Sequence, residues 1–104
     1  MDGESRRVAF APAARQDLAD IRAYLGPRSP QGYASVVRAI ERRILLARDN
    51  PAIGRPAVKE GVRELVEPRY GYVIPYVVHR NTILVLRIYR AVRAPLDPDT
   101  LEKP

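Results

Sequence analysis

Arginine and tyrosine side chains recur through the second half of the chain, in a pattern that could bind phosphate groups. A guanidinium group holds a phosphate through two parallel hydrogen bonds, and a tyrosine ring can stack on a base. A metal-free ribonuclease could be assembled from such groups, with arginine stabilising the charge on the scissile phosphate and lysine or tyrosine transferring protons. The residues concerned are Arg63, Arg69, Tyr70, Tyr72, Tyr76, Arg87, Tyr89, Arg90 and Arg93.

Several of these side chains could equally have structural roles. Tyr72 and Tyr76 also fit core positions beneath packed helices, because a tyrosine ring is largely apolar. Arg87 could instead form a salt bridge across a sheet, with Glu64 or Glu67 as its partner. The pattern by itself therefore leaves both a phosphate site and a structural cluster open.

Most other kinds of active site are excluded by the residues that the chain lacks. It contains no cysteine and one histidine, so we expect neither a metal site nor a cofactor. It has no glycine-rich loop of the nucleotide-binding types. A catalytic triad would need His79 with Ser5, Ser29 or Ser35, and His79 is expected to be solvated or hydrogen-bonded at the end of a strand. We expect no small-molecule substrate either.

The charge of the chain favours an anionic partner. Its 104 residues contain 18 lysines and arginines against 12 aspartates and glutamates, which gives a net charge of +6. Such a surface attracts nucleic acid or an acidic protein segment. No apolar run approaches the roughly 20 residues of a membrane span, and the lack of cysteine suits a reducing compartment. We expect a cytoplasmic protein without membrane contact.

An amphipathic helix is predicted after a short strand at residues 6–10. Pro12 suits the first turn of a helix, and Gly26-Pro27 is expected to end it, because glycine favours the C-terminal cap and proline cannot continue the helix. Asp17 falls on the solvent side of this helix. The predicted buried face consists of Ala14, Leu18, Ile21 and Leu25.

A second helix is predicted from Ser29, as the N-cap, and Pro30 to Asn50-Pro51, with about four residues joining the two helices. The two form an antiparallel hairpin. The predicted buried stripe contains Tyr33, Val36, Val37, Ile40, Ile44 and Ala47. The side chains left for solvent are Arg38, Glu41, Arg42, Arg43 and Arg48.

The remainder of the chain is typical of β-structure. Residues 52–61 form a predicted loop, and strands are predicted at 62–67, 72–79 and 82–91. Proline cannot donate a ladder hydrogen bond, so Pro75 predicts a β-bulge or a position whose nitrogen faces away from its neighbour. Alternation along the last strand puts Ile83, Val85, Arg87 and Tyr89 on one face and Leu84, Leu86, Ile88 and Arg90 on the other.

The predicted element order is βααβββ, an α+β fold in which a helical hairpin packs on a small antiparallel sheet. We expect one domain over residues 1–104, with its core in 6–93 and an acidic, proline-containing tail in 94–104.

Five local sequence patterns, in this order, resemble the ParE/RelE toxin superfamily over residues 6–93. The resemblance implies the βααβββ fold and the toxin half of a type II toxin–antitoxin module, formerly described as a plasmid stabilisation protein. The patterns are the opening Val8 to Ile21 with Tyr24-Leu25, the P-x-x-G-R link in Asn50 to Arg55, the G-x-R-E-L strand Gly61 to Leu65, and the last two strands Tyr72 to Val78 and Ile83 to Arg90.

The superfamily divides by target. The RelE-like branch cuts messenger RNA on the ribosome with basic residues of the sheet and a C-terminal tyrosine or histidine, whereas the ParE-like branch poisons DNA gyrase. Arg63 matches the arginine of the G-x-R-E-L strand, Lys59 lies near the position of the RelE-like lysines, and Tyr89 stands where this group often has histidine. The tail offers no further tyrosine or histidine, which weakens the nuclease alternative, and the long helical hairpin and the P-x-x-G-R link favour the ParE-like branch.

We therefore expect a gyrase inhibitor without catalytic residues of its own. The alternatives are a ribosome-dependent messenger RNA endonuclease that uses Arg63, Arg87, Tyr89 and Lys59, and a non-toxic interaction module. The nuclease requires Arg63, Arg87 and Tyr89 to converge on one phosphate, and strand alternation puts the last two on the same face.

The resemblance also implies a cognate ParD-like antitoxin that folds on binding and forms a hetero-oligomer with the toxin. An amphipathic antitoxin helix is expected in a groove along the helical hairpin, with Tyr24, Leu25 and Tyr33 near one end. The residues expected to contact the target or the acidic side chains of the antitoxin are Arg63, Arg87, Tyr89, Arg90 and Arg93.

Overall fold

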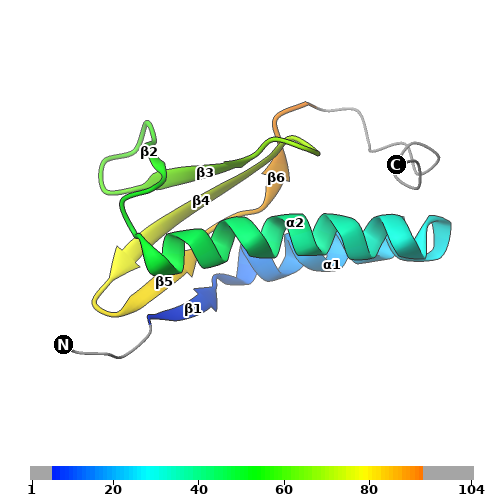
Figure 1. Ribbon diagram of the computed structural model, residues 1–104, viewed down its shortest axis with the longest axis horizontal. Coiled ribbons are helices and arrows are strands. Elements are labelled where there is room, and N and C mark those ends of the chain that lie inside the picture. Colours follow the sequence, from blue (N-terminus) through cyan, green and yellow to red (C-terminus); the bar gives the residue numbers. More distant parts are fainter. Residues whose placement is uncertain (1–5, 93–104) are drawn as a thin grey trace.

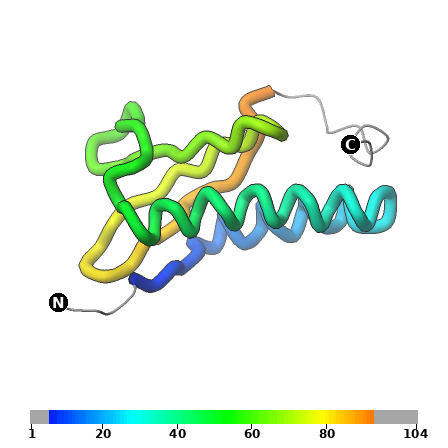
Figure 2. The backbone as a smooth tube through the Cα atoms, viewed as in Figure 1, coloured from blue at the N-terminus to red at the C-terminus, as the bar shows by residue number. Residues whose placement is uncertain are grey.

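Two antiparallel helices pack on one face of a β-sheet in the computed structural model, which describes residues 6–92 (Figure 1). The tube view in Figure 2 shows that the turn of the helical hairpin extends beyond the end of the sheet. The helices are α1 (Pro12–Arg28) and α2 (Pro30–Asp49). The strands are β1 (Arg7–Phe10), β2 (Arg55–Pro56), β3 (Arg63–Glu67), β4 (Tyr72–His79), β5 (Thr82–Val85) and β6 (Tyr89–Arg90).

The strands follow the order β1-β5-β4-β3-β2 across the sheet, and β6 also pairs with β4. All pairs are antiparallel except β1–β5, which is parallel. The predicted α+β fold with a helical hairpin on the sheet is confirmed, and the sheet is mixed because β1 joins its edge alongside β5. The predicted loop at 52–61 contains one additional short strand, β2.

A single residue, Ser29, separates the two helices, in place of the four expected. Its N–H donates to the carbonyl of Leu25 at 2.7 Å and so closes α1, while its Oγ accepts the N–H of Gly32 at 3.1 Å and caps α2. The expected end of α1 at Gly26-Pro27 is wrong, since the helix continues to Arg28. Pro27 lies in the last turn, where its missing N–H removes a single hydrogen bond of the helix. The predicted N-cap role of Ser29 is confirmed, and the tight link holds the helices side by side.

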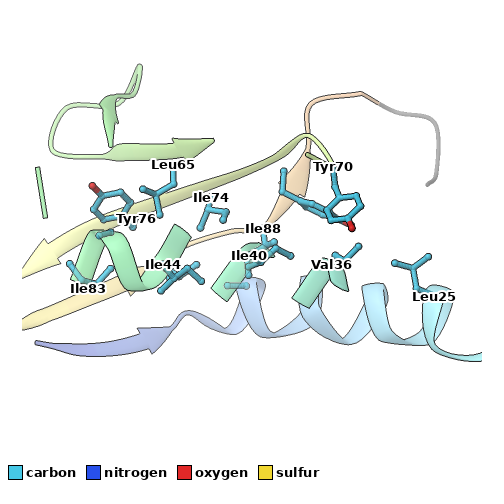
Figure 3. Packing of buried hydrophobic residues seen from close by; sticks show 14 residues of the cluster. Leu25, Val36, Ile40, Ile44, Leu65, Tyr70, Ile74, Tyr76, Ile83 and Ile88 are labelled. Atoms are coloured by element: carbon cyan, nitrogen blue, oxygen red, sulfur yellow. The ribbon is translucent and has the colours of Figure 1, made fainter. Parts of the chain in front are cut away.

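The core lies between α2 and the inner face of the sheet (Figure 3). The predicted core positions of Tyr72 and Tyr76 are confirmed, since they are 4% and 0% exposed. Ala14 and Leu25 of α1 are buried, while Leu18 and Ile21 are half-buried against the core. The other buried hydrophobic residues of this cluster are Val36, Ile40, Ile44, Ala47, Leu65, Tyr70, Ile74, Ile83, Val85 and Ile88.

A β-bulge divides the strand predicted at 82–91 into β5 and β6. Tyr76 pairs with Val85, and Val73 pairs with Tyr89. Between these pairs, two residues of β4 (74–75) lie opposite three residues of the neighbouring segment (86–88). The bulge expected at Pro75 therefore forms opposite this residue rather than in its own strand. β4 runs unbroken through Pro75, and the carbonyl of Pro75 accepts the N–H of Leu86 at 2.8 Å, at the start of the bulge.

The extra residue shifts the alternation of side chains along the last strand. Ile83, Val85 and Ile88 are buried beneath the helices, at 0%, 0% and 2% exposure. Tyr89 pairs with Val73, which lies on the outer face of the sheet. The predicted common face for Val85 and Tyr89 is therefore wrong, because the bulge at 86–88 restarts the alternation after Val85.

Candidate functional site

Arg87 lies in the bulge and is held by helix α1. Its Nε and Nη2 donate to the two carboxylate oxygens of Asp17 at 2.8 and 3.1 Å, and the N–H of Ile88 donates to the same carboxylate at 2.8 Å. These hydrogen bonds, with the charge of Asp17, raise the pKa of Arg87 above its ordinary value. Neither Glu64 nor Glu67 is its partner, so that alternative is wrong.

The acceptor Asp17 was expected to face solvent, yet only 13% of its side chain is exposed. Asp17 and Arg87 are 70 positions apart in the chain, and no local pattern links them. Sequence reasoning missed Asp17 because its role depends on the bulge, which turns the Ile88 N–H and the Arg87 side chain toward α1.

Tyr89 follows on the outer face, next to Arg87. Its side chain is 39% exposed, and the guanidinium carbon of Arg87 lies 6.0 Å from the centre of its ring. The structure therefore brings two of the predicted site residues together on an accessible surface. A half-exposed tyrosine beside a guanidinium is typical of protein–protein contact sites.

Arg63 lies elsewhere, on the inner face of β3. It pairs with buried Tyr76, and its Nη1 donates to the carbonyls of Gly54 at 2.7 Å and Ala52 at 3.4 Å. β3 and β6 flank β4 on opposite sides, so their backbones are roughly 10 Å apart across the sheet. Arg63 and Tyr89 also lie on opposite faces of the sheet, because paired residues on neighbouring strands share a face. The partner of Arg63 is Tyr76, which is buried beneath the helices, and the partner of Tyr89 is Val73, on the outer face. The three residues of the nuclease arrangement do not converge in this structure.

The remaining predicted basic residues are also dispersed. Lys59 is exposed in the turn before β3. Arg90 donates from Nε to the carbonyl of Tyr70 at 2.9 Å and so fixes the turn between β3 and β4. Arg93 and the acidic tail at 94–104 lie outside the described residues.

The P-x-x-G-R link is explained by a contact with Tyr76. The hydroxyl of this buried tyrosine donates to the carbonyl of Pro51 at 2.7 Å and accepts the N–H of Gly54 at 3.0 Å. A Cβ atom at position 54 would lie 2.7 Å from the tyrosine ring and 2.9 Å from the carbonyl oxygen of Glu64, so only glycine fits. This link fixes the segment that holds Arg63.

A groove runs along the helical hairpin, as two adjoining hollows of about 780 and 250 Å³ that share Leu18. The smaller hollow is mainly apolar and reaches β1, where Val8 and Phe10 line it. We call the two together the hairpin groove. Its lining residues are Val8, Phe10, Leu18, Ala19, Arg22, Ala23, Gly26, Pro27, Pro30, Tyr33, Val37, Ile40, Glu41, Ile44 and Leu45.

The three residues expected at one end of this groove occupy different environments. Tyr33 lines the groove and is half-buried. Tyr24 is also half-buried, with the guanidinium of Arg28 4.3 Å above its ring. Leu25 is only 1% exposed and belongs to the core, because the tight turn at Ser29 folds α2 over it. Leu25 therefore supports the groove from beneath rather than lining it.

Residues 6–92 contain neither a metal-binding cluster nor a membrane-spanning helix. No group of three or more histidine, cysteine, aspartate or glutamate side chains in this range could hold a metal ion. Neither helix of the described chain is long and apolar enough to cross a bilayer.

Comparison with known proteins identifies close similarity to bacterial toxins. The family described as ParE toxin of the type II toxin–antitoxin system, parDE, matches residues 8–95. A curated protein named Putative toxin Y4kP, from Sinorhizobium fredii, is 33% identical over 76 residues, which are 73% of this chain and 79% of the relative.

Solved structures show the same fold. A structure of the chromosomal ParDE system of P. aeruginosa matches with a TM-score of 0.67 and 26% identity, over 83% of this chain and 96% of that chain. The E. coli RelBE toxin–antitoxin complex matches with a TM-score of 0.65 and 15% identity, over 86% of this chain and all of that chain. The second likeness concerns the fold alone.

Proposed function

Because the chain belongs to the ParE toxin family of type II toxin–antitoxin systems, we propose that it inhibits DNA gyrase and that a cognate ParD-like antitoxin neutralises it. The observation that carries the choice of target is the separation of Arg63 from Arg87 and Tyr89. A nuclease of the RelE-like kind would need all three at one phosphate, whereas an inhibitor of gyrase needs only a surface.

The bonding of the two arginines adds support for an inhibitor. Arg63 is engaged by two backbone carbonyls and Arg87 by a carboxylate, so moving either guanidinium to a scissile phosphate would break existing hydrogen bonds. The pair Arg87 and Tyr89 instead presents a charge and an aromatic ring 6.0 Å apart on an exposed part of the surface. In this proposal the pair contributes to the surface that contacts gyrase.

The hairpin groove is the proposed binding site of the antitoxin. It combines an apolar floor at Val8, Phe10 and Ile44 with the exposed edge of Leu45, which is 36% exposed. An amphipathic helix buries its apolar face in such a groove and orders as it binds. The likeness of this chain to a structure of the chromosomal ParDE toxin–antitoxin system of P. aeruginosa supports an antitoxin partner.

The target is tested with purified chain in two parallel assays. We expect loss of gyrase supercoiling activity and accumulation of cleaved DNA, with no cleavage of messenger RNA on ribosomes. Messenger cleavage with unaffected supercoiling would replace the proposal with the nuclease. Harmless expression in cells lacking the antitoxin, with neither activity, would indicate the non-toxic module.

Two matched variants test the antitoxin site. Leu45→Glu puts a charge in the hairpin groove, and Val58→Glu puts the same charge on a fully exposed valine in the loop before β3. We expect Leu45→Glu to weaken antitoxin binding by about tenfold or more and Val58→Glu to leave it unchanged, since a buried hydrophobic contact is worth one to a few kcal/mol. Equal binding by both variants would place the antitoxin elsewhere.

A further inference from the structure

Four arginine side chains from two separate elements line one hollow of about 420 Å³ between α2 and the β3–β4 turn. Arg38, Arg42 and Arg43 come from α2, and Arg69 comes from the turn. We call this hollow the arginine groove. Its other lining residues are Ser35, Ala39, Leu46, Glu67 and Pro68.

The one carboxylate in the groove is committed to the turn. Glu67 is 2% exposed, and its two oxygens accept the backbone N–H groups of Arg69 at 2.9 Å and Tyr70 at 2.8 Å. Within residues 6–92, none of the four guanidinium groups lies within 4 Å of a carboxylate. Arg55 and Arg87 differ from them, since each has an acidic partner in the same part of the chain.

Such a cluster is unfavourable for the protein alone. Arg38 and Arg42 are four residues apart on one helix, where like charges repel, and Arg43 and Arg69 add to the same field. The repulsion is relieved when an anion enters the groove and the guanidinium groups donate to it. We propose that the arginine groove binds phosphate groups, from a nucleic-acid backbone or from a free polyphosphate.

Phosphate suits this groove better than the carboxylates of a peptide. A phosphate group presents several acceptor oxygens at one point and can accept from more than one guanidinium at once. Carboxylates carry one charge each, and three or four of them would have to reach a hollow of about 420 Å³ on separate side chains. The rigid placement of three of the arginines on one helix favours the compact ligand.

The arginine groove is separate from the hairpin groove. It lies between α2 and the β3–β4 turn, whereas the hairpin groove lies between α1 and α2, and the two share no lining residue. The proposal therefore does not depend on gyrase or on an antitoxin. Its failure would leave the proposed function untouched.

The test measures binding of two probes to the purified chain, a labelled DNA duplex and inorganic tripolyphosphate. The groove variant is Arg38→Gln with Arg42→Gln, and the control variant is Arg7→Gln with Arg15→Gln, which removes the same charge from exposed positions outside the groove. Circular dichroism verifies that both variants fold. A glutamate-rich peptide serves as the competing carboxylate ligand.

We expect the groove variant to lose about tenfold or more in affinity and to lower the salt dependence of DNA binding by roughly two counterions, with a smaller loss in the control. A loss of affinity for both probes, or for one of them, that is larger in the groove variant than in the control supports the proposal and identifies the phosphate source. Equal losses of affinity in the two variants would show that net charge alone explains the binding, and would overturn the proposal. Tighter, groove-dependent binding of the peptide would also overturn it.

Discussion

The carboxylate of Asp17 on α1 accepts hydrogen bonds from the side chain of Arg87 at 2.8 and 3.1 Å and from the N–H of Ile88 at 2.8 Å. This contact joins the first helix to the bulge that separates β5 from β6. The bulge leaves the Ile88 N–H without a strand partner, and Asp17 supplies the acceptor. The same carboxylate orients Arg87 beside Tyr89, so it positions the proposed contact surface.

Asp17→Ala should therefore destabilise the bulge. We expect a loss of about 1 to 2 kcal/mol in the free energy of unfolding, because the partly buried Ile88 N–H loses its acceptor. Urea denaturation measures this loss, and hydrogen exchange of the Ile88 amide should accelerate. Arg87→Gln is the control: it keeps the Asp17–Ile88 hydrogen bond and should cost less. A larger loss for Arg87→Gln would contradict the assignment.

Gly54→Ala should be strongly unfavourable, since its Cβ would lie 2.7 Å from the Tyr76 ring and 2.9 Å from the Glu64 carbonyl. We expect a loss of about 1 to 3 kcal/mol in the free energy of unfolding, as for other overpacked sites. Gly26→Ala provides the matched control, because its Cβ would meet only Arg22 Cγ at 3.9 Å. Alanine favours the helix at that position, so its stability should be unchanged or slightly higher.

Tyr70→Phe should stabilise the chain. Tyr70 is 7% exposed, and its buried hydroxyl has no hydrogen-bond partner among residues 6–92. Removal of an unsatisfied polar group recovers a desolvation cost of about 1 kcal/mol. Thermal and urea denaturation would detect the gain. Tyr76→Phe is the contrasting change. It should destabilise the chain by a similar amount, because the Tyr76 hydroxyl donates to the carbonyl of Pro51 and accepts the N–H of Gly54. Lower stability of Tyr70→Phe would indicate a partner for its hydroxyl.

Stability should fall in alkali because of Tyr72. Burial raises its pKa from 10.0 to about 12, with a smaller upward effect from Glu67 and an opposing effect of the Arg90 charge. Between pH 10 and 12 the unfolded chain releases this proton first, so the free energy of unfolding should decrease by roughly 2 kcal/mol over that window. Tyr72→Phe should flatten the decrease in urea denaturation at pH 9 and pH 11.5. Identical slopes for both proteins would refute the role of Tyr72.

The local sequence determined the elements and most of the core. Apolar spacing of three and four residues located both helices, Ser29-Pro30 marked the start of the second, and β-branched runs located the strands, because these features act within a few neighbouring residues. Pro75 predicted a bulge for the same reason, since a missing N–H disrupts the ladder wherever it occurs.

Only the tertiary structure decided which side chains meet. One extra residue in the bulge put Tyr89 on the face opposite to Val85, and it directed the N–H of Ile88 toward Asp17. Neither effect has a signal in the neighbouring sequence. The separation of Arg63 from Arg87 depends on the strand order, and the arginine groove depends on how α2 lies against the β3–β4 turn. Side-chain periodicity specifies the face of one element, whereas contacts across elements depend on register and packing, which are set by the whole chain.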